Sequence, residues 1–366
     1  MSYSFGEKFK ITTFGESHSE AIGIVIEGVP YGTKIDYNLI RKELNRRRPG
    51  KNSYSTKRNE LDDFEILSGV FNGVSVGSSI GAIIKNKNQI SKDYSNLKVN
   101  PRPSHSDYPA FIKYNGFNDI RGGGQFSGRL TAPIMIAGAI AKSILEKENI
   151  FITSHIKSIY NINDDEIDLA NIKKEDLINI KEKEFPVIND NKGNEMISLI
   201  EKVSGEKDSV GGIIEVVIFN MPIGVGEPLY DSVESKISSG IFSIPGVRGV
   251  EFGLGFDATK LKGSTHNDEY YYDKDGIVKT KTNNHGGVIG GMTSGMPIVF
   301  KVAIKPTSSI AKRQSTINIE KKDVENIEIA GRHDPCIVPR ALPAIEAITA
   351  ISILDLIMLG DFYGIR

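Results

Sequence analysis

The sequence predicts an α+β fold in which antiparallel strands and helices come in mixed order. Two segments, 130–146 and 341–359, are rich in Ala, Ile, Leu and Met on nearly every side, which is typical of helices buried in a core. Strand-like segments do not alternate strictly with helices, as they would in a doubly wound parallel fold. No stretch has the composition of a domain linker, so we expect residues 1–366 to form a single domain.

Local patterns predict the individual elements. A helix is expected over 37–47, after a turn at 29–32. Runs of β-branched and aromatic residues bounded by Gly, Pro or Asn predict strands at 11–26 (with a turn at 15–17), 64–73, 79–85, 210–219, 249–256 and 298–304. Asn, Asp, Glu and Lys dominate the segment from about 161 to 207, which we interpret as solvated helices at the periphery.

Composition argues against several classes of protein. The formal net charge of −1 lacks the basic excess that nucleic-acid binding relies on. The single cysteine, Cys336, excludes an internal disulfide and fits a reducing compartment. We find no apolar run of the roughly 20 residues that a spanning helix needs, and no signal-peptide layout at residues 1–8. We therefore expect a cytoplasmic protein that binds neither nucleic acid nor membrane.

Four of the six histidines lie in short segments crowded with Gly, Arg, Asp and Ser, namely His18, His105, His285 and His333. Histidine is the side chain whose ordinary charge change falls near neutral pH. The shared surroundings of these residues predict one assembled site that handles protons and anions, and therefore an enzyme. His155 and His266 lack such neighbours and are expected at the surface.

Three segments offer groups that could bind an anion. Arg46–Arg48 end the first helix, where consecutive side chains point in different directions, so at most two of them can face one site. Residues 121–129 place a run of three glycines (Gly122–Gly124), Ser127 and Arg129 before the apolar helix, and helix N-termini bind anions. Residues 305–309 add an ammonium, hydroxyls and amides. A helix-dipole contact or a plain capped turn remains an alternative for each segment.

Other chemistries have weaker support. His105 and Asp107 form an H-x-D pair, yet no H-E-x-x-H motif or cysteine pair supports zinc, and the neighbouring arginines would repel a cation. We therefore predict no metal. A serine hydrolase based on Ser17 lacks the G-x-S-x-G elbow. Neither nucleotide-binding glycine fingerprint is present.

Taken together, the motifs resemble the chorismate synthase family over residues 6–359. The resemblance lies in Gly15–His18, Arg46–Gly50, Arg102–Asp107, Gly122–Arg129, Gly226–Pro228, Val247–Gly253, Asn284–Gly287, Lys305–Ser309 and Gly331–Cys336. Several motifs in one order are far more specific than any one of them alone.

The resemblance implies a lyase at the last step of the shikimate pathway, in aromatic amino acid biosynthesis. Such enzymes convert 5-enolpyruvylshikimate 3-phosphate to chorismate by a 1,4-anti elimination of phosphate, and they use reduced FMN (FMNH2) with no net redox change. The resemblance also implies a single-domain β-α-β sandwich, with antiparallel sheets outside and helices between them, and a homotetramer.

The resemblance also assigns roles to residues of this chain. His18, beside Ser17, would give a proton to the departing phosphate, His105 would adjust the protonation of the flavin, and Asp334 would belong to a relay that accepts a proton from flavin N5. The substrate would be held by Arg47, Arg48, Arg129 and Arg332. The positions expected to contact FMN are Gln125, Ser127, Gly246, Gly290, Lys305, Pro306, Thr307, Ser308, Ser309 and Arg332.

The chain departs from the common family pattern in three places. Residues 125–129 lack one arginine and one serine, and Pro245-Gly246 stands where relatives often carry Asn-Ala. Ser53 replaces an arginine, so the NADPH contact of those relatives does not transfer. Two rival functions remain, a flavin-dependent oxidoreductase on the same scaffold and a flavin- or phosphate-binding module without catalysis.

Overall fold

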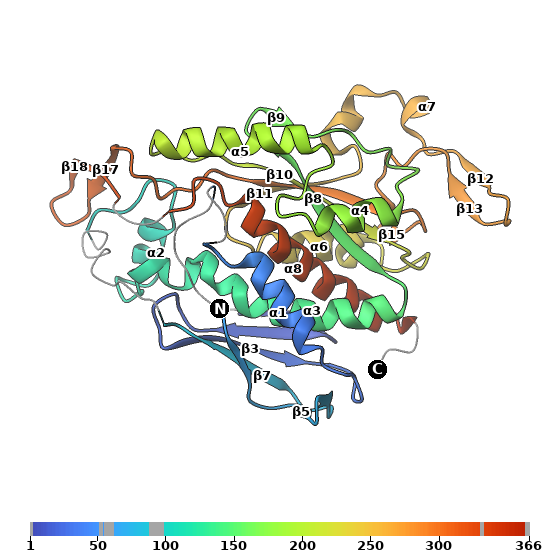
Figure 1. Ribbon diagram of the computed structural model, residues 1–366, viewed down its shortest axis with the longest axis horizontal. Helices are drawn as coiled ribbons and strands as arrows, with labels where there is room; N and C mark the ends of the chain where they lie inside the picture. The colour runs from blue at the N-terminus through green and yellow to red at the C-terminus, as the bar shows by residue number, and fades with distance from the viewer. Residues whose placement is uncertain (1–2, 51–53, 55–61, 88–98, 330–332, 363–366) are drawn as a thin grey trace.

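The computed structural model describes residues 3–50, 54, 62–87, 99–329 and 333–362. Two five-stranded sheets enclose a layer of helices (Figure 1). The first sheet has the order β1 (Ser4–Phe5), β2 (Lys10–Phe14), β3 (Ala21–Glu27), β7 (Ile80–Lys85) and β4 (Phe64–Ile66). The second has the order β11 (Val247–Phe252), β16 (Ile298–Ile304), β10 (Gly212–Phe219), β8 (Phe151–Ile159) and β9 (Ile162–Asn163).

All strand pairs within these two sheets are antiparallel over the described residues. The helices between the sheets are α1 (Tyr37–Arg47), α3 (Thr131–Lys147), α6 (Val233–Ile241) and α8 (Val338–Leu359). Helix α3 contacts β2, β3 and β7 of the first sheet, α8 contacts β8 and β10 of the second, and the two helices pack on each other. The α+β class and the predicted β-α-β sandwich are confirmed.

The remaining described elements lie around this sandwich (Figure 1). They are α2 (Asp107–Lys113), α4 (Lys174–Lys181), α5 (Asp190–Gly205), α7 (Gly263–His266), the 3-10 turns Arg121–Phe126, Gly128–Leu130, Leu229–Asp231 and Gly255–Lys260, and the hairpins β5 (Val70–Phe71)–β6 (Val74–Ser75), β12 (Tyr270–Tyr272)–β13 (Val278–Thr280), β14 (Val288–Ile289)–β15 (Met292–Thr293) and β17 (Gln314–Asn318)–β18 (Asp323–Ile327). The polar segment 161–207 contains β9, α4 and α5, and α5 buries Met196 and Ile200 while its other side is exposed.

Helices α3 and α8 are apolar because both are enclosed by protein. By length and hydropathy alone, Gly128–Lys147 and Val338–Leu359 could cross a membrane, although we found no apolar run of that length in the sequence. In the structure 83% and 89% of these apolar stretches are buried inside the protein, as in core helices. Helix α8 also begins three residues before the predicted start at Ala341, because Pro339 falls in the first turn, where a helix needs no backbone N–H donor.

Gly138 permits the close packing of α3 on α8. A Cβ at Gly138 would lie 2.3 Å from Ala347 Cβ and 2.6 Å from Ala347 Cα. We therefore expect Gly138→Ala to lower the free energy of unfolding by about 1–3 kcal/mol through overpacking, in spite of alanine's higher helix propensity.

Denaturant unfolding measures this effect, and Gly205→Ala is the matched control. Gly205 also lies in a helix, but no neighbouring atom would come within 4 Å of its Cβ. The control should therefore be neutral or stabilising by up to about 1 kcal/mol. Equal stability of the two variants would contradict the packing argument.

Candidate active site

A cavity of about 770 Å³ opens where six segments meet. They are the C-terminal end of α1, the stretch before α2, the glycine-rich stretch before α3, the α6–β11 connection, the segment after β16 and the N-terminal end of α8. Among the described residues, the cavity's charged lining is Arg47, Arg102, Arg129, Arg248, Lys305 and Arg340, with the single carboxylate Asp334. The size suits a small substrate or cofactor, and the excess of cations favours a ligand with several negative charges.

Only one of the three consecutive arginines at the end of α1 lines the cavity. Arg47 lines the cavity, whereas Arg48 lines a second pocket of about 630 Å³. Arg46 turns toward Glu43 and Glu346. The argument from helix geometry is therefore confirmed, but Arg48 does not lie in the cavity where a substrate contact was expected.

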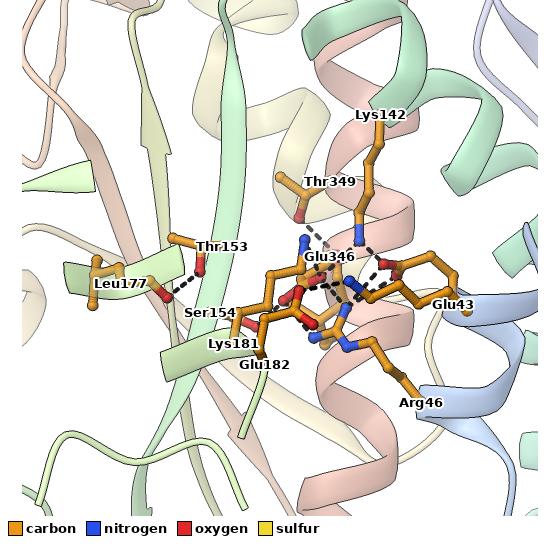
Figure 2. Close-up of polar contacts among 12 residues, drawn as sticks. Glu43, Arg46, Lys142, Thr153, Ser154, Leu177, Lys181, Glu182, Glu346 and Thr349 are labelled. Atoms are coloured by element: carbon orange, nitrogen blue, oxygen red, sulfur yellow. Dashed lines mark hydrogen bonds and ion pairs between the residues drawn. The ribbon is translucent and has the colours of Figure 1, made fainter. Parts of the chain in front are cut away.

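A buried ion network fixes the end of α1 (Figure 2). Glu346 of α8 accepts hydrogen bonds from Arg46 at 2.7 and 3.0 Å, from Lys142 Nζ at 2.6 Å and from Ser154 Oγ at 2.8 Å. Glu43 of α1 accepts a further bond from Lys142 at 2.8 Å. The network ties α1, α3, α8 and β8 together, and it thereby sets where the next residue, Arg47, enters the cavity.

The charges of this network stabilise one another. Burial by itself would raise the pKa of Glu346, but the charges of Arg46, Lys142 and Lys181 outweigh it and hold that pKa well below its usual range. Burial likewise opposes the charge on Lys142, yet Glu346 and Glu43 raise its pKa. Glu346 lies in α8, and the other four charged groups come from the neighbouring helices α1, α3 and α4 and point toward it, as Figure 2 shows.

His105 is oriented by a buried carboxylate. Its Nδ1 lies 2.6 Å from Asp107 Oδ1, so Nδ1–H donates to that oxygen, and Nε2 makes no hydrogen bond to a described residue. Arg102 donates to the same carboxylate from Nε at 2.7 Å and from Nη2 at 2.8 Å. Burial raises the pKa of Asp107, but the bonds from Arg102 and His105 outweigh it and keep the pKa below its usual range. An imidazole held in this way can exchange a proton with a ligand in the cavity through Nε2.

His18 and Ser17 lie behind the cavity wall. Both side chains are buried, and the cavity-lining residue next to them is Gly122. The φ of Gly122 is +60°, and a Cβ there would come within 2.2 Å of the His18 ring and 2.6 Å of Ser17 Oγ. Only glycine fits this close approach. The structure thus brings His18 beside the cavity without placing it in the lining.

Residues 305–309 form one wall of the cavity and are locked to the segment before α2. Lys305 Nζ donates to the Ser104 carbonyl at 2.7 Å and to Ser308 Oγ at 2.6 Å, and Arg102 Nη1 donates to Ser309 Oγ at 3.0 Å. Burial and the charge of Arg248 lower the pKa of Lys305. The buried Thr307 Oγ1 hydrogen-bonds no described residue, so it can bond to a ligand.

The other expected site residues fall into three groups. Gln125, Ser127, Gly246 and Asp334 line the cavity, and Asp334 forms an ion pair with Arg340. Gly290 lies in the β14–β15 turn and is not part of the lining. Arg332 lies outside the described residues.

The histidines do not all converge as expected. His105 and His333 line the cavity, but His285 pairs with Asp268 at 2.9 Å in another part of the fold and packs edge-on against the half-buried His266. The expectation that His155 is a surface residue is wrong. Its side chain is fully buried in β8, 3.5 Å from Glu215, and burial lowers its pKa to about 3.

Sequence reasoning did not single out three cations of the cavity. Arg102 and Arg248 were noticed only as members of longer motifs, and Arg340, in the first turn of α8, was not noticed at all. An arginine at the N-terminal end of an otherwise apolar helix was the signal available for Arg340. The role of Arg248 depends on its approach to Lys305, which no local pattern shows.

The fold and the cavity define an enzyme-like protein with a site for a polyanionic ligand. The chain belongs to the chorismate synthase family, since the sequence model of that family, described as chorismate synthase, matches residues 9–358.

Similar proteins agree with this assignment over almost their whole length. The chorismate synthase of Methanococcus aeolicus is 46% identical over 366 residues, covering 98% of each chain. That of Thermococcus kodakarensis is 44% identical over 351 residues, covering 96% of each chain. A crystal structure of chorismate synthase superposes with a TM-score of 0.76 and 29% identity, covering 98% of this chain and 95% of the other.

Proposed function

We propose that this protein is a chorismate synthase, a lyase that forms chorismate from 5-enolpyruvylshikimate 3-phosphate by 1,4-anti elimination of phosphate. The observation that carries the proposal is the cationic cavity, built from the family motifs in a chain that matches the family over residues 9–358. The substrate carries a phosphate and two carboxylates, so its burial needs several fixed cations nearby. Arg47 and Arg129 are the cavity cations that we assign to it.

The residues around the cavity also fit reduced FMN, whose phosphate needs cations together with hydroxyl or amide donors. Lys305 and the hydroxyl of Thr307, which hydrogen-bonds no described residue, offer such groups in one wall. Gln125, Ser127, Gly246 and residues 305–309 would hold the cofactor. Reduced FMN, when bound, would lend an electron and take it back within the turnover, which would help the phosphate to leave with no net redox change.

The protein's own acid–base groups would manage the protons. His105 faces the cavity and is held by Asp107, so it would exchange a proton at Nε2 and adjust the protonation of the flavin. His18 would give a proton to the departing phosphate, which requires the Gly122 segment to move aside because it stands between His18 and the cavity. Asp334, paired with Arg340, would take part in a proton relay.

One assay separates the candidate functions. The protein is incubated anaerobically with reduced FMN and 5-enolpyruvylshikimate 3-phosphate while phosphate and chorismate absorbance are followed. We expect equal amounts of phosphate and chorismate without net consumption of reduced FMN. Net consumption would favour the oxidoreductase, and binding without phosphate release would favour a binding module. In this assay dithionite reduces the FMN chemically. Repeating the assay with NADPH in place of dithionite then shows whether the protein reduces its own flavin.

We further infer a cytoplasmic homotetramer that binds neither nucleic acid nor membrane. The single cysteine and the net charge of −1 support the compartment and the absence of nucleic acid, while the tetramer rests on the family alone. Light scattering after size-exclusion chromatography measures the oligomeric mass directly, and a monomer would contradict the proposal.

A further inference from the structure

We infer that Asp62 is a positioning residue for substrate binding, whose carboxylate holds the guanidinium groups of Arg47 and Arg129 at the separation and orientation that the anionic substrate requires. Both arginines line the cavity, but Asp62 does not. It therefore acts through them and not by touching the substrate. The inference rests on the proposed function, because it takes the substrate to be a compound with phosphate and carboxylate groups.

The three residues come from distant parts of the chain. Arg47 ends α1, Asp62 precedes β4, and Arg129 lies just before α3. Arg47 Nη1 donates to Asp62 Oδ2 at 2.8 Å, and Arg129 Nη1 donates to Asp62 Oδ1. Each carboxylate oxygen thus takes one guanidinium. The Asp62 side chain is 0% exposed and those of the arginines 3% and 5%, so water screens these bonds little.

A second contact fixes the plane of each guanidinium group. Arg47 Nε donates to Thr131 Oγ1 at 2.9 Å, and Arg129 Nε donates to Asn86 Oδ1 at 3.2 Å. Because the guanidinium is planar, two anchored nitrogens determine how the rest of the group is directed. Asp62 is the anchor that both groups share, so it also sets the distance between them.

The alternative is that Asp62 only balances positive charge, and the two roles predict opposite results. If the carboxylate merely weakened the positive potential, its removal would strengthen the binding of an anion. If it positions the arginines, its removal releases one or both of them, and substrate binding weakens. The next residue, Asp63, provides a matched control, because it is 65% exposed and pairs only loosely with Lys87 at 3.4 Å.

The test compares Asp62→Asn, Asp63→Asn and the wild-type protein. The asparagine keeps the size of the side chain but loses the charge and one acceptor oxygen. We expect Asp62→Asn to raise the KM for 5-enolpyruvylshikimate 3-phosphate by about 10- to 100-fold, the effect of losing a hydrogen bond to a charged group. The Kd from calorimetry should rise by a similar factor, and kcat should fall by less than about 10-fold, because the arginines bind ground state and transition state alike. Asp63→Asn should match the wild type.

Two further variants keep the inference testable if Asp62→Asn does not fold. Asp62→Glu retains the charge but displaces it by one methylene, and we expect it to fold while its KM stays raised. Thr131→Val removes the second anchor of Arg47 and should raise KM by about 3- to 10-fold.

The inference is overturned if folded Asp62 variants bind the substrate within about twofold of the wild type, or more tightly. It is also overturned if kcat falls with no change in KM and Kd, since that would indicate a purely structural disturbance of the reaction. A wild-type protein that releases no phosphate would instead refute the proposed function, and the two failures are therefore distinguishable.

Discussion

Replacement of His105 by alanine is expected to lower turnover by about 100-fold or more, which is the usual effect of losing a general acid or base. The structure supports a catalytic role for this ring, since Asp107 holds Nδ1 and the ring lines the cavity with Nε2 unpaired to any described residue. His18→Ala should have an effect of the same size. Single-turnover measurements with reduced FMN under anaerobic conditions give the rates.

His285→Ala is the control for these two variants. His285 forms a similar pair with Asp268, at 2.9 Å, but does not line the cavity. The His285→Ala variant should therefore retain near-normal turnover. Near-normal turnover in the folded His105 or His18 variant would remove that residue from the mechanism.

Replacement of Glu346 by alanine is expected to lower the free energy of unfolding by about 3–5 kcal/mol, because it leaves buried cations without their counter-charge. The side chain is 0% exposed and contacts Arg46, Lys142 and Lys181. Urea unfolding followed by circular dichroism measures the change. Glu195→Ala is the control, since its ion pair with Lys192 lies on the surface of α5 and should be worth at most about 1 kcal/mol. Equal losses in both variants would contradict the argument.

The same network predicts how stability depends on pH. The pKa of Glu346 is depressed in the folded protein, so its contribution is present above the unfolded value of about 4.3 and is lost as the pH falls through the folded value. The pKa of Lys142 is raised, so its contribution is present below about 10.4 and is lost as the pH rises through the folded value. The unfolding midpoint should therefore fall at both extremes of pH. In Glu346→Gln the fall of the midpoint at acid pH should be less steep.

Local sequence patterns were sufficient to predict elements in which apolar residues are buried and polar residues are exposed. Helix α1 has the predicted bounds, Tyr37–Arg47, because its Asp36 cap and amphipathic spacing are local features. Strand β8 was not predicted, since its run contains His155 and Lys157, which normally indicate a surface. Both are buried because residues 164–188 fold back over this strand, as the bonds from Thr153 Oγ1 to the Leu177 carbonyl at 3.2 Å and from Lys157 Nζ to the Asp165 carbonyl at 3.0 Å show. The local sequence of a strand cannot show that a later segment of the chain will bury it.

The candidate site also has parts that local sequence predicts and parts that only distant contacts determine. Motifs located the glycine-rich segment, residues 305–309 and His105, because each motif is continuous in sequence. The directions of Arg46 and Arg47 at the end of α1 depend on partners in α8 and near β4, namely Glu346 for Arg46 and Asp62 for Arg47. Gly290 is the opposite case, since the family resemblance assigned it to the site but the fold keeps it out of the cavity lining.

Helix α8 has a consequence for how the chain is made. Near its start, Arg340 donates to the carbonyl of Arg47 at 3.3 Å, its middle supplies Glu346, and Asp355 near its end accepts amide hydrogen bonds from Glu7, Lys8 and Phe9 at 2.7–3.1 Å. Every other described element precedes α8 in the chain. The ribosome therefore synthesises α8 after every other described element, and the apolar faces that α8 covers, on α3, α6 and the second sheet, stay exposed in the nascent chain until α8 has emerged.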